Sequence, residues 1–458
     1  MHIAILGRQP ALGVAELERL YGSHAVSWFG DASARIATDS FDFARLGGSL
    51  KAGRVTLELP GGNWRRVSTA IVEHYLKAWA STEHKLTLGI SAYGFDRVSP
   101  RDVQGTGIIL KKKLRAHDVS IRLVPNQEAA LGTASSHHNK LGSSPHRVEL
   151  LVVRGSSGRI IVAESVGAQN ITAFAARDQA RPRTDAFVGM LPPKLARMLV
   201  NLTGGVRPVG PTSTPARVAR GGAAPIRPMG ELGANRVTGP ESSDLRAEHA
   251  GGGAGDDGSG VHAPETDDGR SEPRKADPMT ILDPFCGTGV VLQEAALLGY
   301  RAYGTDLSDK MVAYSRENLD WLNRKYHLDT TVTIEQGDAR DHTWQSPIDA
   351  VVCEAYLGQP FSAPPSPAKL TEVRGNCDHI ISSFLANIGR QLAAGTPLVI
   401  AVPAWSDGTG YFTHLPFISQ LDKLGYRRID LQHVRPEQLL YYREGQVVAR
   451  ELLILQKS

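Results

Sequence analysis

Apolar segments of strand length alternate with segments of helical periodicity through residues 279–458, and this alternation limits the fold more than any other feature. It is typical of a parallel β-sheet with helices on its faces. The expected strands are residues 279–283, 301–306, 331–338, 348–353 and 396–403, and the expected helices are residues 290–298, 308–322 and 381–395. Two later apolar stretches, 427–434 and 446–456, are expected to form a terminal antiparallel pair. The sequence therefore predicts an α/β domain.

Composition changes abruptly between residues 204 and 278, where Gly, Pro, Ser and charged residues replace aromatic and β-branched clusters. Such a segment buries too little apolar surface to offset its chain entropy, so we predict a disordered low-complexity insertion. With 458 residues the chain is long enough for two or three domains. We divide it into an N-terminal region (1–165), a linker with a helix (166–203), the insertion, and the α/β domain.

Charge is distributed unevenly along the chain. Residues 1–205 carry 26 Lys and Arg against 16 Asp and Glu, a net charge of +10, whereas residues 279–458 carry 16 against 20, a net charge of −4. The insertion carries 9 Lys and Arg against 11 Asp and Glu. This near balance favours a solvated spacer over an RNA-binding tail. The N-terminal region is therefore the part that should approach a polyanion.

Cysteine usage and hydropathy exclude several protein classes. Three cysteines, Cys286, Cys353 and Cys377, argue against a disulfide framework, and none lies in a C-x-x-C pair typical of zinc sites. His137 and His138 are adjacent, but no third ligand has suitable spacing, so we expect no metal. There is no signal-like N-terminus and no run near the roughly 18 apolar residues of a membrane span, so we expect a cytoplasmic protein without a membrane partner.

A glycine-containing turn, DPFCGTG at residues 283–289, separates the first expected strand from its helix. Gly287 and Gly289 allow a tight turn and a close ligand, and the free N–H groups of the helix N-terminus lie beyond them. A nicotinamide-binding motif would have a third glycine where this chain has Leu292, and Asp283 precedes the turn. The pattern favours a nucleotide ligand other than a nicotinamide.

Two further aspartates follow neighbouring strands. Asp306 ends the second strand, where a carboxylate can accept both ribose hydroxyls, and Asp338 ends the third, where it can bind an adenine amino group. Each aspartate alone could equally be a helix cap or a solvated loop charge. Together with Asp283 they predict an adenosyl ligand in one crevice at a topological switch point.

These motifs carry a resemblance to a known family. DPFCGTG, TDLS, GDAR and the closing antiparallel pair resemble class I S-adenosylmethionine-dependent methyltransferases, and the whole chain resembles the THUMP-containing tRNA guanine-N2 methyltransferases that modify position 10. Residues 177–202 resemble the segment that precedes the first strand in this family, and HKLTLGISAYG, GIILKKKLRAHDVSIRLV and SSHHNKLG resemble a THUMP domain.

The resemblance implies a Rossmann-like seven-stranded mixed sheet after an N-terminal α+β THUMP-like RNA-binding domain, S-adenosyl-L-methionine as cofactor and tRNA as partner. The implied cofactor-binding residues are Asp283, Phe285, Gly287, Gly289, Asp306 and Asp338.

A basic cluster in the N-terminal region is the candidate RNA-binding surface. Its expected members are Lys111, Lys112, Lys113 and Arg115 near a helix end, Arg122 on the next strand, and His138 and Lys140 in a polar loop. Phosphate contact is one reading. The other is structural, because cations near a helix C-terminus are favoured by the helix dipole.

The candidate catalytic motif is VVCEAYLGQPF, residues 351–361, an expected strand that runs into Glu354 and Tyr356. The resembled family has Asp-Pro-Pro-Tyr-Gly here; Glu354 replaces the Asp, Tyr356 a proline, Leu357 stands at the aromatic position, and Gly358 is retained. A carboxylate that accepts N–H bonds from a guanine amine stabilises the charge that develops during methyl transfer. An aromatic ring can stack on the extruded base. Alternatively, Glu354 bonds backbone amides of the loop and Tyr356 is a core aromatic.

Three functions therefore compete: a tRNA methyltransferase, an RNA-binding protein with an altered catalytic motif, and a methyltransferase acting on another base or on a small molecule. The charge of the N-terminal region favours a nucleic acid over a small molecule.

Overall fold

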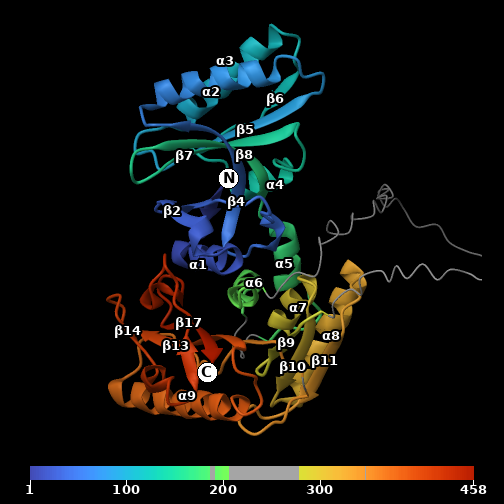
Figure 1. Ribbon diagram of the computed structural model, residues 1–458, viewed down its shortest axis with the longest axis vertical. Helices are drawn as coiled ribbons and strands as arrows, with labels where there is room; N and C mark the ends of the chain where they lie inside the picture. The colour runs from blue at the N-terminus through green and yellow to red at the C-terminus, as the bar shows by residue number, and fades with distance from the viewer. Residues whose placement is uncertain (186–190, 206–277, 346) are drawn as a thin grey trace, which may run out of the picture. The chain divides into compact units, whose positions relative to one another are not determined.

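A computed structural model describes residues 1–185, 191–205, 278–345 and 347–458 (Figure 1). Nearly all of the segment predicted to be a disordered insertion lies outside these residues. The described residues belong to one compact unit by their contacts.

The N-terminal region is an α+β structure around one mixed sheet, whose order within the described residues is β2-β3-β1-β4-β8-β7-β5-β6. Its strands are β1 (His2–Leu6), β2 (Val26–Gly30), β3 (Ser33–Ile36), β4 (Ser49–Leu59), β5 (Leu86–Tyr93), β6 (Ile121–Leu123), β7 (Arg147–Arg154) and β8 (Ile160–Ala168). Its helices are α1 (Pro10–Tyr21), α2 (Trp64–Trp79), α3 (Pro100–Arg115) and α4 (Thr133–His138). Strand β5 pairs in parallel with β6 and β7, and the other pairs are antiparallel.

Helices α2 and α3 cover one face of this sheet (Figure 1). Ser99 begins α3 with a capping box, because its hydroxyl accepts from the Asp102 amide while the Asp102 carboxylate accepts from the Ser99 amide. Ile71 of α2 and Leu110 of α3 are fully buried among the strand side chains. The basic end of α3 therefore lies on a helix held by its cap and its apolar face.

Two helices connect this region to the C-terminal sheet: α5 (Ile171–Gln179) and α6 (Pro193–Leu202). Leu195, Leu199 and Leu202 of α6 are fully buried in a core that also contains side chains of α1 and of the C-terminal strands. Helix α6 is thus part of the core, not an exposed linker.

The C-terminal sheet has the main order β11-β10-β9-β12-β13-β17-β15 within the described residues, with β14 and β16 paired to its side. Its strands are β9 (Thr280–Asp283), β10 (Arg301–Asp306), β11 (Val332–Gln336), β12 (Ala350–Glu354), β13 (Pro397–Ser406), β14 (Phe412–Thr413), β15 (Tyr426–Arg428), β16 (Leu440–Tyr441) and β17 (Val448–Lys457). Its helices are α7 (Val290–Leu297), α8 (Asp309–Tyr326) and α9 (Pro367–Ile388). Pairs from β11 to β13 are parallel and those of β17 are antiparallel, which confirms the mixed Rossmann-like sheet.

Two elements, one helix and one strand, have boundaries that differ from those expected from the sequence. Helix α9 begins at Pro367, well before residue 381, because the Ser366 hydroxyl caps it and a proline suits the first helical position. Of the expected strand 427–434 only the first two residues lie in β15. The chain leaves the sheet there because the Gln432 and His433 amides donate to the carboxylate of Glu18 in α1.

Candidate functional site

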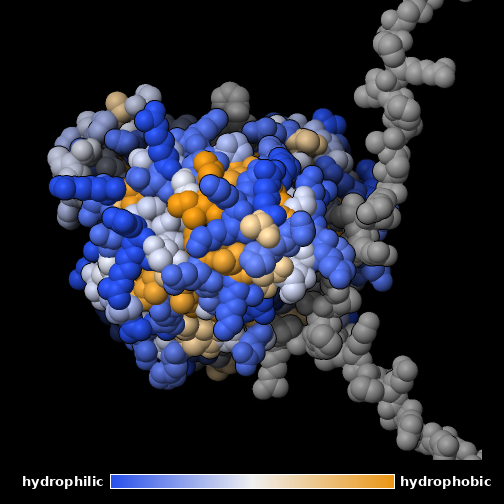
Figure 2. All heavy atoms as spheres, turned by 90° about the horizontal axis from the view of Figure 1, so that it is seen from above, coloured by the Kyte–Doolittle hydropathy of each residue, from blue (hydrophilic) through white to orange (hydrophobic). Residues whose placement is uncertain are grey.

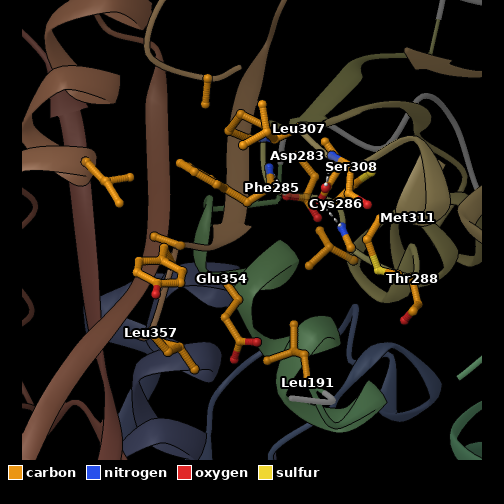
Figure 3. A pocket seen from close by; sticks show the side chains of 18 of the residues that line it. Leu191, Asp283, Phe285, Cys286, Thr288, Leu307, Ser308, Met311, Glu354 and Leu357 are labelled. Carbon is orange, nitrogen blue, oxygen red and sulfur yellow. Dashed lines mark hydrogen bonds between the residues drawn. The ribbon is translucent and has the colours of Figure 1, made fainter. Parts of the chain in front are cut away.

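A pocket of about 830 Å³ lies at the carboxyl ends of β9, β10 and β12 (Figure 3). Strands β9 and β12 are neighbours, but their pairing stops at Leu282 and Val351, so the residues that follow diverge. Because β10 lies on the other side of β9, this gap is the switch point of the sheet, where open α/β sheets bind their ligands. The pocket is lined by all four predicted carboxylates: Asp283, Asp306, Asp338 and Glu354.

The glycine turn holds its shape through backbone bonds. The Cys286 amide donates to the Thr305 carbonyl over 2.9 Å, and Gly287 lines the pocket with a φ of +51°. Gly289 has a φ of +80° but lies outside the pocket lining, and a Cβ there would meet Leu319 at 2.9 Å. Of the two glycines, only Gly287 is placed to approach a ligand, whereas Gly289 allows close packing against α8.

Asp283 is 2% exposed, and its carboxylate accepts one hydrogen bond of 3.1 Å from the Phe285 amide. Burial raises its pKa well above the ordinary value, and the negative charges of Asp306 and Glu354 act in the same direction. The Phe285 ring packs edge-on against Phe384 of α9 and forms an apolar wall of the pocket. This side of the pocket therefore holds a buried carboxyl group with a raised pKa beside an aromatic ring.

Asp306 is anchored by backbone amides on both carboxylate oxygens, from Gly287 and from Ser308, each at 2.9 Å. Burial raises its pKa, while these two bonds oppose that change. The bonds fix the orientation of the carboxylate, and each oxygen keeps a lone pair for a further donor.

Asp338 lies two residues beyond β11, not at its end as expected. Its carboxylate pairs with the guanidinium of Arg340 at 2.6 Å, and this pairing lowers its pKa. A ligand amine at this place would therefore share Asp338 with Arg340.

Glu354 accepts a hydrogen bond from Nε of Arg450 in β17. Burial raises the pKa of Glu354, and Arg450 opposes that change. Figure 3 shows the carboxylate of Glu354 directed into the pocket between Leu357 and Leu191. The hydrogen-bond partner of Glu354 is therefore a buried arginine. This differs from the alternative in which Glu354 bonds the backbone amides of the following loop.

Tyr356 is 42% exposed and lines the same pocket, which does not fit a core aromatic. Gly358 has a φ of +79°, so the loop after β12 turns where a left-handed residue is needed. That turn leaves the Tyr356 ring accessible to a planar group.

The sequence analysis missed Arg450 and the rim pair of Lys310 and Asp185. Arg450 is 7% exposed in a strand of apolar residues, and a buried charge in such a strand requires a partner, which was an available signal. Its partner, 96 residues away, could not be identified from spacing.

The predicted RNA-binding residues fall into two groups. Lys112, Lys113 and Arg115 are exposed at the end of α3, and Lys111 is half-buried there. Arg122 of β6 donates to Asn139 at 3.0 Å, which brings it to the end of α4. Figure 2 looks onto the side where α2 and α3 lie in Figure 1, and hydrophilic side chains cover most of it around an apolar area.

His138 and Lys140 are exposed, but His138 lies in α4 and not in a loop as expected. The helix forms because the Ser136 and Asn139 amides donate back to residues four positions earlier.

Within the described residues no cluster of three His, Cys, Asp or Glu side chains could hold a metal ion. No described helix is both long and apolar enough to cross a membrane.

Parts of the chain are similar to known methyltransferases. A family model for a "Methyltransferase domain" matches residues 275–420. A tRNA (guanine(10)-N2)-dimethyltransferase of Methanothermobacter thermautotrophicus is 32% identical over 127 residues, which are 28% of this chain and 34% of that protein. The chain thus spans about a third of that relative's length.

A probable tRNA (guanine(10)-N2)-dimethyltransferase of Methanothermococcus thermolithotrophicus is 30% identical over 124 residues, 26% of this chain and 68% of that protein. The crystal structure of TrmN from Thermus thermophilus covers 100% of this chain and 99% of its own with 16% identity and a TM-score of 0.46.

Proposed function

Because the chain belongs to the tRNA (guanine(10)-N2)-dimethyltransferase family, we propose that it transfers methyl groups from S-adenosylmethionine to the exocyclic N2 amine of a guanosine in tRNA. The observation that carries this proposal is the pocket itself, where Asp283, Asp306, Asp338 and Glu354 surround one hollow at the switch point. Position 10 follows from the family resemblance, and a cytoplasmic location is part of the same proposal, supported by tRNA as the proposed substrate.

The residues present fit S-adenosylmethionine. The anchored carboxylate of Asp306 suits the ribose hydroxyls, Asp338 suits the adenine amine, and the turn at Gly287 gives space for a closely bound ligand. Buried Asp283 faces the remaining part of the pocket, where a cationic group would stabilise its ionised form. When bound, the cofactor supplies an electrophilic methyl group on a sulfonium.

Glu354 is the proposed catalytic carboxylate. The guanine amine is a weak nucleophile because its lone pair is delocalised into the ring. Formation of the N–C bond would accompany breakage of the methyl–sulfur bond, which leaves a neutral thioether and a positive charge on the amine. The Glu354 carboxylate stabilises that charge by accepting the N–H and then takes up the proton that the amine loses. Tyr356, exposed at the pocket, stacks on the extruded base and fixes its approach.

The N-terminal region, residues 1–165, is the proposed THUMP-like RNA-binding part, and residues 279–458 form the catalytic domain. Lysines and arginines on α3 and β6 contact phosphates. The excess of positive charge in residues 1–205 supports this assignment.

The test is incubation of the purified full chain with unmodified tRNA and S-adenosylmethionine carrying a labelled methyl group, followed by mass spectrometry of the nucleosides. We expect label in N2-methylguanosine. If tRNA binds and no label is incorporated, the chain is an RNA-binding protein with an altered motif. Label in another nucleoside would replace the proposed target.

A further inference from the structure

Arg450 is a buried charged residue beside the pocket to which the proposed function gives no role. It lies in β17, in register with Pro403 of β13 and Tyr441 of β16, and its side chain is 9% exposed. Its Nε donates to Oε1 of Glu354. A buried guanidinium in a sheet needs a function that offsets the cost of its desolvation.

Arg450 uses one lone pair of Glu354 Oε1, so Oε2 and the second lone pair of Oε1 remain for ligand donors. Oε1 is engaged by Arg450, and the carboxylate reaches into the pocket opposite Leu191 (Figure 3). Arg450 thereby sets both the orientation of Glu354 and the side from which donors can reach it.

Arg450 also acts on the charge of Glu354. The negative charge of Glu354 raises the pKa of Asp283 on β9 and of the Cys353 thiol that precedes it on β12. Burial disfavours the ionised form of Glu354 itself, and Arg450 opposes that effect. Paired with the guanidinium of Arg450, the Glu354 carboxylate serves as a hydrogen-bond acceptor.

An acceptor-only group distinguishes the purines. Guanine presents two adjacent donors on its Watson–Crick edge, N1–H and the N2 amine, whereas adenine presents its N6 amine beside an N1 acceptor. An ionised Glu354 satisfies both guanine donors but places an oxygen against adenine N1. A protonated Glu354 would suit adenine instead, since it donates one bond and accepts another.

We propose that Arg450 is a specificity-determining positioning residue, which holds Glu354 ionised and oriented so that the pocket accepts the donor–donor edge of guanine and rejects adenine. This inference rests on the proposed function of the same pocket. It attributes the choice between guanine and adenine to the hydrogen bond between Arg450 of β17 and Glu354 of β12.

The experiment compares wild type with Arg450→Met, which keeps the side-chain length without charge, and with Arg450→Lys, which restores the charge. Arg428→Met is the matched control, because Arg428 of β15 pairs with Glu451, the neighbour of Arg450 in β17, at 3.6 Å. The substrates are a tRNA transcript and the same transcript with adenosine at the modified position. Rates are measured against pH, with melting temperature and cofactor affinity for each variant.

For Arg450→Met we expect a rate on guanosine that is roughly 10- to 100-fold lower at neutral pH. The acidic limb of its pH–rate profile should move to higher pH, so that the rate recovers on the alkaline side. The ratio of the rate on guanosine to the rate on adenosine should become smaller. Arg450→Lys should recover part of the rate, and Arg428→Met should match wild type.

A wild-type pH profile and base preference in Arg450→Met would overturn the inference. Equal loss at every pH with unchanged base preference would also overturn it, because that pattern indicates a purely structural role. Absence of N2-methylguanosine with the wild type would contradict the proposed function itself, which separates the two failures.

Discussion

Arg197 in α6 donates a hydrogen bond of 2.7 Å to the carboxylate of Glu294 in α7, which has no exposed surface. The other carboxylate oxygen accepts from Arg177 of α5 at 2.5 Å, and both guanidinium groups lie over the Phe174 ring. One buried acid therefore joins the helices before the C-terminal domain to the helix that follows the glycine turn.

Replacing Glu294 with Ala should destabilise the fold strongly. The change leaves two buried guanidinium groups without a counter-charge, so the free energy of unfolding should fall by about 3–5 kcal/mol. Chemical denaturation measures this loss. Glu317→Ala is the control, because the Arg183–Glu317 pair is half-exposed and should contribute at most about 1 kcal/mol. Equal losses in both variants would contradict the assigned role.

Packing behind the glycine turn gives a second prediction. A Cβ at Gly304 of β10 would meet Leu292 at 2.5 Å and Cys286 at 3.1 Å, so Gly304→Ala should cost about 1–3 kcal/mol and weaken cofactor binding by displacing the turn. Gly375 lies in α9, and no atom lies within 4 Å of the position that a Cβ would take. Gly375→Ala should therefore raise the free energy of unfolding by about 0.5–1 kcal/mol, because a helix interior favours Ala over Gly. Thermal unfolding of the two variants tests both expectations. A higher melting temperature in Gly304→Ala would disprove the packing argument.

Buried Asp283 predicts a specific pH dependence. Its folded pKa is raised, so its contribution to stability is fully present below the unfolded pKa and is lost as pH rises through the folded value. Asp283→Asn removes the ionisable group and should flatten the decline in unfolding free energy between the unfolded pKa and the raised folded pKa. Asp422→Asn, at an exposed position, should leave the profile unchanged. A decline of equal slope in Asp283→Asn would show that another group causes it.

The same carboxyl links cofactor binding to protons. A bound cation beside Asp283 favours its ionised form, so binding of S-adenosylmethionine should release protons. Calorimetry in buffers of different ionisation enthalpy measures the release, which should diminish in Asp283→Asn. Proton uptake on binding would contradict this prediction.

The basic end of α3 should control the salt dependence of tRNA binding. Replacing Lys112 and Lys113 with Ser should weaken binding and reduce the slope of log affinity against log salt by about one to two, because fewer phosphates are neutralised. Lys423→Ser, at an exposed position of the C-terminal domain, should change neither. An unchanged slope in the double variant would locate the RNA surface elsewhere.

The alternation of apolar segments predicted the central strands β9, β12 and β13, because each of these buried parallel strands is a nearly continuous apolar run. The convergence of Asp283, Asp306 and Asp338 was predicted from one rule, that parallel strands end at the same edge, and all three line the pocket. Sequence spacing could not predict that residues 429–434 leave the sheet, since this depends on Glu18 in another helix. The pair of Glu354 with Arg450 was missed for the same reason, because sheet order and not sequence distance brings β12 and β17 close.

The most direct measurement of the central claim is the single-turnover rate of N2-methylguanosine formation by Glu354→Gln and by wild type, with cofactor affinity determined on the same samples. The substitution keeps the shape of the side chain and removes its charge. We expect a rate lower by about 100-fold or more with cofactor affinity unchanged, because the lost carboxylate acts on the guanine amine and not on the bound cofactor. Equal rates in the two proteins would contradict it.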